Sequence, residues 1–263
     1  MPHEEGFMRV LARTNLSLAL KVTAAAVLVG LFAGPHAASA AYFQTDFESG
    51  LPSEITGAGA LEGTQGYSAY GFGNTFLRDV SPTSQPITLT LTNLPTHTSI
   101  SLDFFLAIID SWDGNGDGVN SVAPDFMNVT IDGTPIFSET FENSSNGGFA
   151  TTASYVPPAG VELAHHQDLG FTTGVYYVDS AYNMGLDTLF DNIAHTASTL
   201  TIQWFANGAG WQGTAEDESF AIDNISVTLN GLANDVPEPA AAGLFLGLGA
   251  LALGYYRRRR QAC

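Results

Sequence analysis

The stretch Phe220-Ala-Ile-Asp-Asn-Ile-Ser-Val-Thr-Leu229 predicts a β-strand with one buried face. Apolar residues recur at about every second position, which puts them on one side of an extended chain, and β-branched residues are frequent. The same alternation occurs in four more segments, residues 87–94, 100–106, 127–132 and 200–205. Such strands are typical of antiparallel sheets that bury one face and leave the other in water.

Turn signals separate these segments, and no amphipathic helix of three turns occurs between residues 41 and 235. The turn dipeptides are Asp132-Gly133, Asn146-Gly147, Asn207-Gly208 and Asn230-Gly231. Residues 186–197 can supply one short helical turn. We therefore predict one all-β domain, an antiparallel β-sandwich of the jelly-roll type, over residues 41–235.

The charge of the chain is concentrated in this predicted domain. The 263 residues carry a net charge of −18, yet of the eight basic residues only Arg78 lies between positions 41 and 236. A body of this kind repels phosphate backbones, which excludes nucleic acid as a partner. Its carboxylates have almost no cations to pair with, so they are either solvated or neutralised by metal ions.

The first 40 residues have the layout of a secretory signal peptide. Basic residues precede a short apolar run at 22–33, and Ala38-Ser39-Ala40 has the small residues of a cleavage site. We expect cleavage after Ala40. The apolar run is shorter than the ~20 residues that cross a bilayer. The only cysteine, Cys263, is the last residue, so the exported body holds neither a disulfide nor a catalytic thiol.

The last residues, 236–263, form a second topology signal. An uncharged segment at about 240–256 is just long enough to span a membrane and is followed by a basic cluster. With the preceding Pro237-Glu238-Pro239 triplet, the segment resembles the PEP-CTERM sorting signal of Gram-negative bacteria. The resemblance implies an inner-membrane intermediate, processing by an exosortase, and delivery to the cell surface or the exterior. The alternative is a permanent anchor. The basic cluster comprises Arg257, Arg258, Arg259 and Arg260.

A second resemblance concerns the two ends of the predicted domain. The opening Asp46-Phe-Glu48 and the closing Asp217-Glu-Ser-Phe-Ala-Ile-Asp223-Asn-Ile225 are similar to the paired terminal strands of galactose-binding-like and concanavalin-like jelly rolls, which include carbohydrate-binding modules. This resemblance implies a fold more than an activity. It also implies that Asp46, Glu48 and Asp223 lie side by side around a structural calcium ion. The alternative is that Asp223 is an ordinary buried acceptor of backbone N–H groups.

An acidic loop predicts a first calcium site. Asp113, Asn115 and Asp117 stand at alternate positions before Gly118, as in the first half of a calcium-binding loop. Pro124 occupies the position of the closing glutamate, so the pattern is not that of an EF-hand. We predict a calcium-binding β-loop with Asp110 and Asp125 as further ligands. A solvated turn is the alternative.

Two other groups of residues bear on function. His165-His166-Gln-Asp168 has metal-binding side chains, but adjacent residues of a strand point to opposite faces, so we predict a surface loop here. Trp211 lies in a glycine-rich loop and is a candidate platform for stacking on a sugar, whereas Trp112 and Trp204 are predicted to be packed. No motif of a hydrolase is found.

These observations predict an exported, non-enzymatic β-sandwich protein of the cell surface or extracellular matrix, with calcium as a structural cofactor. The secretion machinery and an exosortase-type enzyme are its expected partners. A carbohydrate-binding module with a polysaccharide ligand is the first alternative, and a glycan-active hydrolase is a weaker one.

Overall fold

The computed structural model describes residues 39–83, 85–115, 123–143, 152–174 and 177–232. Residues 38–233 form one compact unit. The predicted signal peptide up to residue 38 and the predicted sorting signal lie outside the described residues, and Ala40 is part of the first strand. Among the described residues, no helix is long and apolar enough to cross a membrane.

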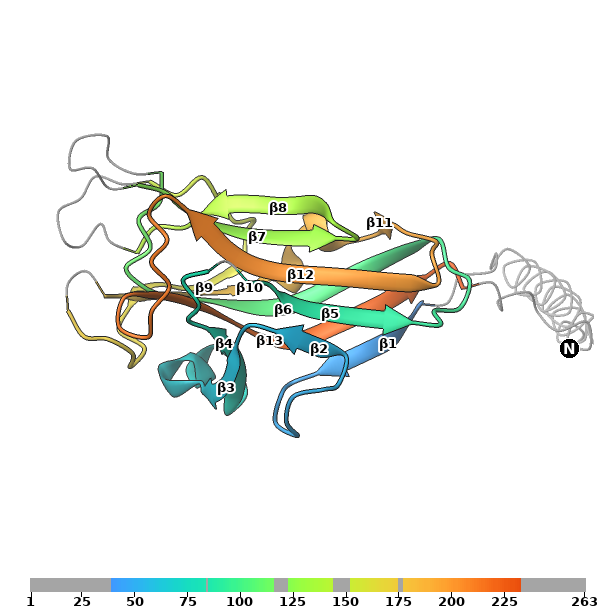
Figure 1. Cartoon of the computed structure of the whole chain (residues 1–263), viewed down its shortest axis with the longest axis horizontal. Coiled ribbons are helices and arrows are strands. Elements are labelled where there is room, and N and C mark those ends of the chain that lie inside the picture. The colour runs from blue at the N-terminus through green and yellow to red at the C-terminus, as the bar shows by residue number, and fades with distance from the viewer. Residues whose placement is uncertain (1–38, 84, 116–122, 144–151, 175–176, 233–263) are drawn as a thin grey trace, which may run out of the picture. The chain divides into compact units, whose positions relative to one another are not determined.

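Two antiparallel sheets make up this unit and confirm the predicted β-sandwich (Figure 1). The larger sheet has eight strands in the path β3-β4-β13-β6-β10-β9, with β1 added to β13 and β11 added to β6. Its strands are β1 (Ser39–Thr45), β3 (Ala60–Gly63), β4 (Thr75–Asp79), β6 (Ser99–Asp110), β9 (Glu162–Gln167), β10 (Asp179–Asn183), β11 (Ile193–Ala194) and β13 (Glu218–Asn230). The smaller sheet has the order β2 (Ile55–Gly57), β5 (Ile87–Thr92), β12 (Thr199–Gly208), β7 (Asp125–Ile131) and β8 (Thr134–Thr140).

The predicted strand at residues 220–229 is the centre of the larger sheet. β13 pairs with β6 from Glu218 opposite Asp110 to Asn230 opposite Ser99. Its other edge is shared, because β4 pairs with the first half of β13 and β1 pairs with the second half. The pairing shifts between these halves at a bulge, where Asn224 has a φ of 49°.

Of the predicted turns, Asp132-Gly133 is confirmed and Asn207-Gly208 is not. Asp132 and Gly133 both have positive φ and form the two-residue connection between β7 and β8, as predicted for a tight hairpin. The prediction of a turn at Asn207-Gly208 is wrong, because both residues end β12 in register with β7. A Cβ atom on Gly208 would lie 2.1 Å from the Pro124 carbonyl oxygen, so the close approach of two backbones requires glycine there.

The main hydrophobic core lies between the two sheets. Alternate residues of β6, β12 and β13 point into it, among them Phe104, Trp204 and Phe220, each at most 1% exposed. The Phe104 and Trp204 rings meet edge to face with their centroids 5.8 Å apart. The alternation that predicted the strands therefore reflects burial on one face, as expected.

The outer face of the larger sheet is not wet throughout, contrary to expectation. A second hydrophobic cluster covers it, in which Ala107, Ala181 and Ala221 come from three neighbouring strands and leave room for the Tyr67 ring. The Tyr67 hydroxyl donates to the Ile108 carbonyl oxygen at 2.9 Å. Tyr67 lies on the 3-10 helix η1 (Gln65–Tyr70), so a segment outside the strands covers this face.

A short helical turn was expected between residues 186 and 197. Two 3-10 turns occur around its start, η3 (Met184–Leu186) and η4 (Thr188–Phe190). The side chains of Asn183 and Asp187 cap them by accepting the N–H groups of Gly185 and Leu189. Residues Ile193 and Ala194 then extend as β11.

Candidate metal centre

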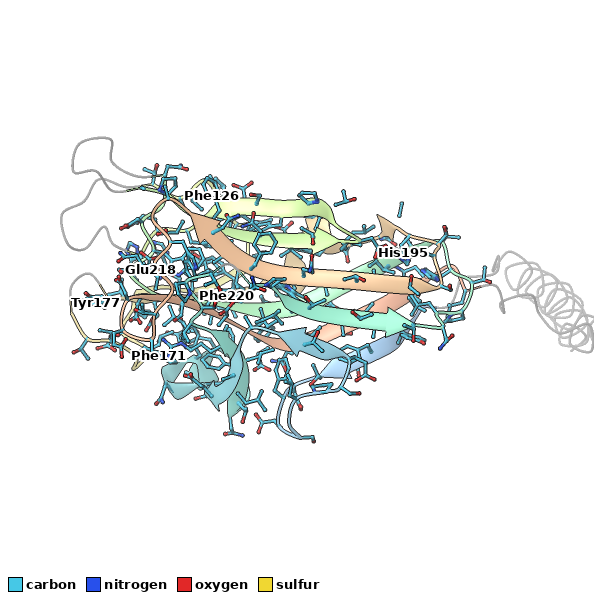
Figure 2. All side chains as sticks on the ribbon, viewed as in Figure 1. Phe126, Phe171, Tyr177, His195, Glu218 and Phe220 are labelled. Atoms are coloured by element: carbon cyan, nitrogen blue, oxygen red, sulfur yellow. The ribbon has the colours of Figure 1, made fainter. Side chains whose placement is uncertain are left out.

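Three carboxylates from distant parts of the sequence converge at one end of the sandwich. Asp125 begins β7, Glu218 begins β13, and Asp113 follows β6, so both sheets contribute. One oxygen of each carboxylate lies within 4.8 Å of the others. Asp125 and Glu218 are 0% and 1% exposed, and Glu218 is labelled at this end of the molecule in Figure 2.

Each of the two buried carboxylates has one oxygen engaged and one oxygen without a partner. The Asp113 N–H donates to Asp125 Oδ2 and the Gln212 N–H donates to Glu218 Oε2, both at 2.8 Å. No hydrogen-bond partner among the described residues reaches Asp125 Oδ1 or Glu218 Oε1, although both atoms are buried. An unpaired buried carboxylate oxygen is costly, so each atom calls for a proton or a cation.

The pKa values of both groups respond to this environment. Burial, together with the charges of Asp113 and Asp217, raises the pKa of Asp125 to about 7. Burial and the charge of Asp125 raise the pKa of Glu218 to about 9. Two carboxylates about 5 Å apart repel each other by about 3 kcal/mol at an effective dielectric of 20. The pair is therefore stable only if it is protonated or if a cation neutralises it.

The donor set fits a hard cation. All three side chains offer carboxylate oxygens, which are the ligands that Ca²⁺ prefers, and oxygens around one Ca²⁺ ion are bound at 2.3–2.6 Å. The backbone at Gly210 packs closely against Asp125. A Cβ atom on Gly210 would lie 2.1 Å from the Ala123 carbonyl oxygen and 2.6 Å from Asp125 Oδ1, so glycine is required there.

The sequence predicted part of this cluster. Asp113 and Asp125 come together as expected, and Asp117 lies outside the described residues. Asn115 Oδ1 accepts a hydrogen bond from the Thr140 hydroxyl at 3.2 Å. The sequence did not predict that Glu218 belongs to this cluster. Glu218 lies in the segment Asp217-Glu218-Ser219, which was interpreted only as evidence for a jelly-roll fold.

The prediction that Asp110 joins this loop site is wrong. The Asp110 carboxylate accepts from the Thr172 N–H and hydroxyl, both at 3.2 Å, and lies 4.0 Å from Arg78. Burial and the nearby charge of Asp179 raise the pKa of Asp110 to about 7. Asp110 is the last residue of β6 and has a φ of 66°.

Arg78, the single cation of the body, does not reach the three converging carboxylates. Its guanidinium contacts Glu62 Oε2 at 3.1 Å and donates to the Ser219 hydroxyl at 2.8 Å. The same group stacks over the Phe171 ring, with 4.6 Å to the centroid. The contacts of the Arg78 guanidinium group therefore lie on the outer face of the larger sheet.

The second predicted calcium group lies around the bulge of β13, but its three carboxylates do not all come within 4.8 Å of one another. Asp223 Oδ2 accepts the Gly73 N–H at 2.9 Å, while Glu48 accepts the N–H groups of Asn74 and Thr75. Asp46 Oδ1 accepts the Glu48 N–H, and burial raises the pKa of Asp223 to about 6. Glu48 and Asp223 thus both act as acceptors for one backbone turn. This matches the alternative in which Asp223 accepts backbone N–H bonds, and calcium at this place remains a prediction.

Trp211 is not an exposed platform, which corrects the prediction. Only 9% of the residue is exposed, and its ring centroid lies 5.2 Å from that of Trp112. Its indole N–H donates to the Ser81 carbonyl oxygen at 3.1 Å. Trp112 and Trp204 are fully buried, as predicted. An indole enclosed in this way has no free face for a sugar ring.

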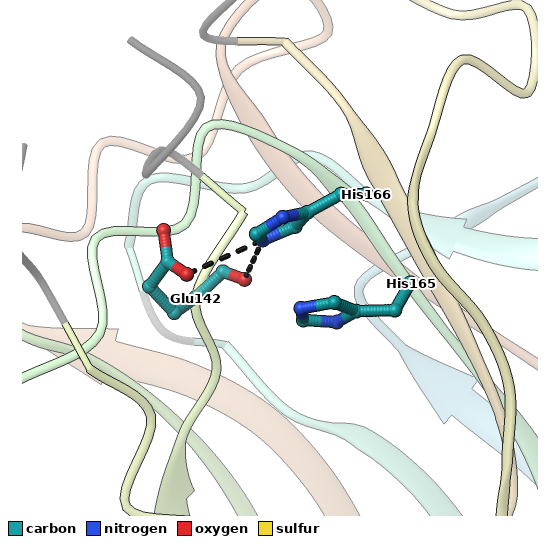
Figure 3. A group of neighbouring side chains, drawn as sticks. All are labelled: Glu142, His165 and His166. Carbon is teal, nitrogen blue, oxygen red and sulfur yellow. Dashed lines mark hydrogen bonds and ion pairs between the residues drawn. The ribbon is translucent and has the colours of Figure 1, made fainter. Parts of the chain in front are cut away.

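The histidine pair lies in a strand, not in the predicted loop. His165 and His166 belong to β9, and their rings stack with centroids 3.8 Å apart (Figure 3). His166 has a φ of 50°, so the rule that neighbours point to opposite faces fails at this bulge. Burial lowers the pKa of His165, whereas a hydrogen bond to Glu142 raises the pKa of His166.

Comparisons with known proteins give one match to a family and several to solved structures. No curated protein sequence matches this chain. The xylan-binding domain CBM22-1 of Paenibacillus barcinonensis Xyn10C is 12% identical with a TM-score of 0.33, covering 76% of this chain and 99% of that one. CBM27-1 of Caldicellulosiruptor saccharolyticus, solved with mannohexaose, is 12% identical with a TM-score of 0.28, covering 71% and 95%. Residues 235–260 match the PEP-CTERM protein-sorting motif, so the chain carries this sorting signal at its C-terminal end.

Proposed function

We propose that this chain is an exported, non-enzymatic β-sandwich protein of a Gram-negative cell surface or extracellular matrix, stabilised by calcium at Asp113, Asp125 and Glu218. The observation that carries the calcium assignment is that one buried oxygen each of Asp125 and Glu218 has no hydrogen-bond partner among the residues that the structure describes. The sorting motif at residues 235–260 supports export and processing by an exosortase-type system. Signal cleavage near Ala38 and Ala40 completes this route.

Calcium suits the proposed location of the protein. Extracellular calcium modules work with dissociation constants of about 10⁻⁴–10⁻³ M, so a site of three carboxylates can be filled outside the cell without unusual affinity. Asp125 and Glu218 start strands of opposite sheets, and an ion between them would tie the sheets together at this end. The proposed role of calcium is therefore structural.

The buried position of the acidic pair also supports a non-enzymatic role. A glycoside hydrolase needs two carboxyl groups that flank a bond of the substrate, and a polysaccharide must reach them. Asp125 and Glu218 are at most 1% exposed, so they are closed to a chain of sugars. The hydrolase alternative therefore draws no support from the acidic groups that converge in the described part of the chain.

Carbohydrate binding is a second candidate, and the outer face of the smaller sheet favours it. Side chains there form hydrogen-bonded rows across neighbouring strands, such as Thr130 to Gln203 and Gln203 to Thr88, both at 3.3 Å. Two partly exposed rings, Phe126 and Phe205, alternate with these polar groups. Amides, hydroxyls and aromatic rings together are the groups that hydrogen-bond and stack on sugars. The polar members of this amide–hydroxyl face are Thr88, Asn128, Thr130, Ser138, Gln203 and Asn207.

We expect millimolar Ca²⁺ to raise the melting temperature of the protein over that in EDTA. Calcium at 100 times its dissociation constant adds about 2.7 kcal/mol to the free energy of unfolding. This corresponds to about 5–10 °C for a domain of this size. Glu218→Gln should abolish the response, and calorimetry should show Ca²⁺ binding to the wild type but not to Glu218→Gln. Glu54→Gln, a change at an exposed carboxylate, serves as the control. An equal calcium response in Glu218→Gln would contradict the assignment.

The calcium-free protein should lose stability as pH rises. Because the folded-state pKa values of Asp125 and Glu218 lie above their ordinary values of 3.8 and 4.5, the native state holds more protons than the unfolded state up to about pH 9. Their stabilising contribution is complete below about pH 4 and is lost as pH rises through about 7 and about 9. Melting in EDTA at pH 5 and pH 8 tests this. A calcium response as large at pH 5 as at pH 8 would speak against the pair as ligands.

Mass spectrometry of the intact, surface-exposed protein tests the export route. We expect the mature chain to lack both the first 40 residues and the four arginines at positions 257–260. The control is a variant in which Pro237, Glu238 and Pro239 are replaced by alanine, which should remain in the membrane fraction. Retention of the arginine cluster in the surface-exposed form would instead indicate a permanent anchor.

Affinity electrophoresis in gels that contain soluble polysaccharides tests the second candidate. If the amide–hydroxyl face binds sugars, a polysaccharide should retard the wild type but not Gln203→Ala, with Glu54→Gln as the matched control. Migration unchanged by every polysaccharide would remove this candidate. Turnover of an oligosaccharide that is lost on a single Asp or Glu substitution would instead favour the hydrolase alternative.

A further inference from the structure

We propose that Glu142, His165 and His166 form a zinc-binding site that joins the edge strands of the two sheets. One ligand atom of each side chain lies within 4.8 Å of the others. Figure 3 shows the Glu142 carboxylate facing the His166 ring, with the His165 ring stacked beside it. This site is separate from the proposed calcium site and does not depend on it.

The backbone of β9 brings the two imidazoles together. His166 has a φ of 50°, and the pairing of β9 with β10 shifts register at this place. A non-glycine residue with positive φ is uncommon, and a bulge of this kind re-aims a side chain. As a result the rings stack with an angle of 23° between their planes and with centroids 3.8 Å apart. One nitrogen of each ring thus lies within 4.8 Å of the other and of a Glu142 carboxylate oxygen.

The third group comes from the opposite sheet. Glu142 follows β8, the edge strand of the smaller sheet, while β9 is an edge strand of the larger sheet. Glu142 Oε2 lies 3.2 Å from His166 Nε2, and the Glu142 carbonyl oxygen lies 2.9 Å from the same nitrogen. An ion held by these groups would therefore close the open edge between the sheets.

The donor set favours zinc over calcium. Two imidazole nitrogens and one carboxylate oxygen are typical Zn²⁺ ligands, whereas Ca²⁺ takes oxygen ligands alone. Three protein ligands leave a fourth position for water. Supporting contacts are present as well, because His165 Nδ1 lies 3.4 Å from the Ser180 hydroxyl and 3.7 Å from Glu162 Oε2. Such outer contacts orient a metal-binding imidazole.

Zinc can reach the site from solvent. The side chains of His165 and His166 are 42% and 18% exposed, whereas that of Glu142 is 9% exposed. The strongly acidic body attracts cations to its surface. A ligand set with one buried anchor and two more accessible imidazoles therefore has an entry path from solvent.

Calorimetry with Zn²⁺ tests the proposal on the full chain in mild detergent, with millimolar Ca²⁺ present so that oxygen-only sites are filled. We expect one zinc ion per chain and a higher melting temperature with zinc. Zinc affinity should fall at least about tenfold in His165→Ala, His166→Ala and Glu142→Gln. His165 is the most exposed of the three, so His165→Ala is the variant most certain to fold, and near-ultraviolet circular dichroism verifies this.

Two controls separate this site from others. Gln167→Ala changes the next residue of the same strand and should bind zinc as the wild type does. Asp125→Asn should lose the calcium response and keep zinc binding. The proposal is overturned if the wild type binds no zinc under these conditions, or if His165→Ala and His166→Ala bind it with unchanged affinity.

Discussion

The pairing of β13 with β6 holds the rest of the molecule in place, because these two long strands run through the middle of the larger sheet. β6 carries β10 and β11 on its other edge, and β13 carries β4 and β1. One face of the pair forms the main core, and the other supports the second cluster through small residues such as Ala107 and Ala221. Both strands also end at the acidic cluster, since Glu218 begins β13 and Asp113 follows β6. Strand register therefore determines where the charges meet.

Charge is the second constraint on this fold. Burial raises the pKa values of several carboxyl groups, Asp125 and Glu218 among them, while the one arginine of the body is used on the outer face of the larger sheet. A protein that buries acids without cationic partners must protonate them or bind metal ions. The two proposed sites would relieve this shortage of cations in different ways. Calcium would bind between the first residues of two strands, and zinc would bind between the edge strands of the two sheets.

The two proposed sites are also neighbours through the backbone. Asp113 and Glu142 form an isolated antiparallel bridge, and the Asn143 N–H donates to the Trp112 carbonyl oxygen at 2.9 Å. Trp112, enclosed between these segments, donates its indole N–H to the Ser219 carbonyl oxygen beside Glu218. One buried ring therefore connects the loop of the acidic cluster with the segment that carries Glu142.

By itself, the sequence determined the sandwich, its five most regular strands and the Asp132-Gly133 hairpin, because alternation and turn chemistry act over a few residues. It also determined the sorting motif, whose parts are contiguous. Only the tertiary structure decided which polar residues meet. Glu218 joins Asp113 and Asp125 across more than ninety positions of sequence, Asp110 turns away to Thr172, and Trp211 is buried against Trp112. The two histidine side chains share one face only because His166 has a positive φ, and no local sequence pattern predicts this φ. Strand pairing over long sequence distances and the φ angle of His166 bring these side chains together, and neither can be predicted from the spacing of residues in the sequence.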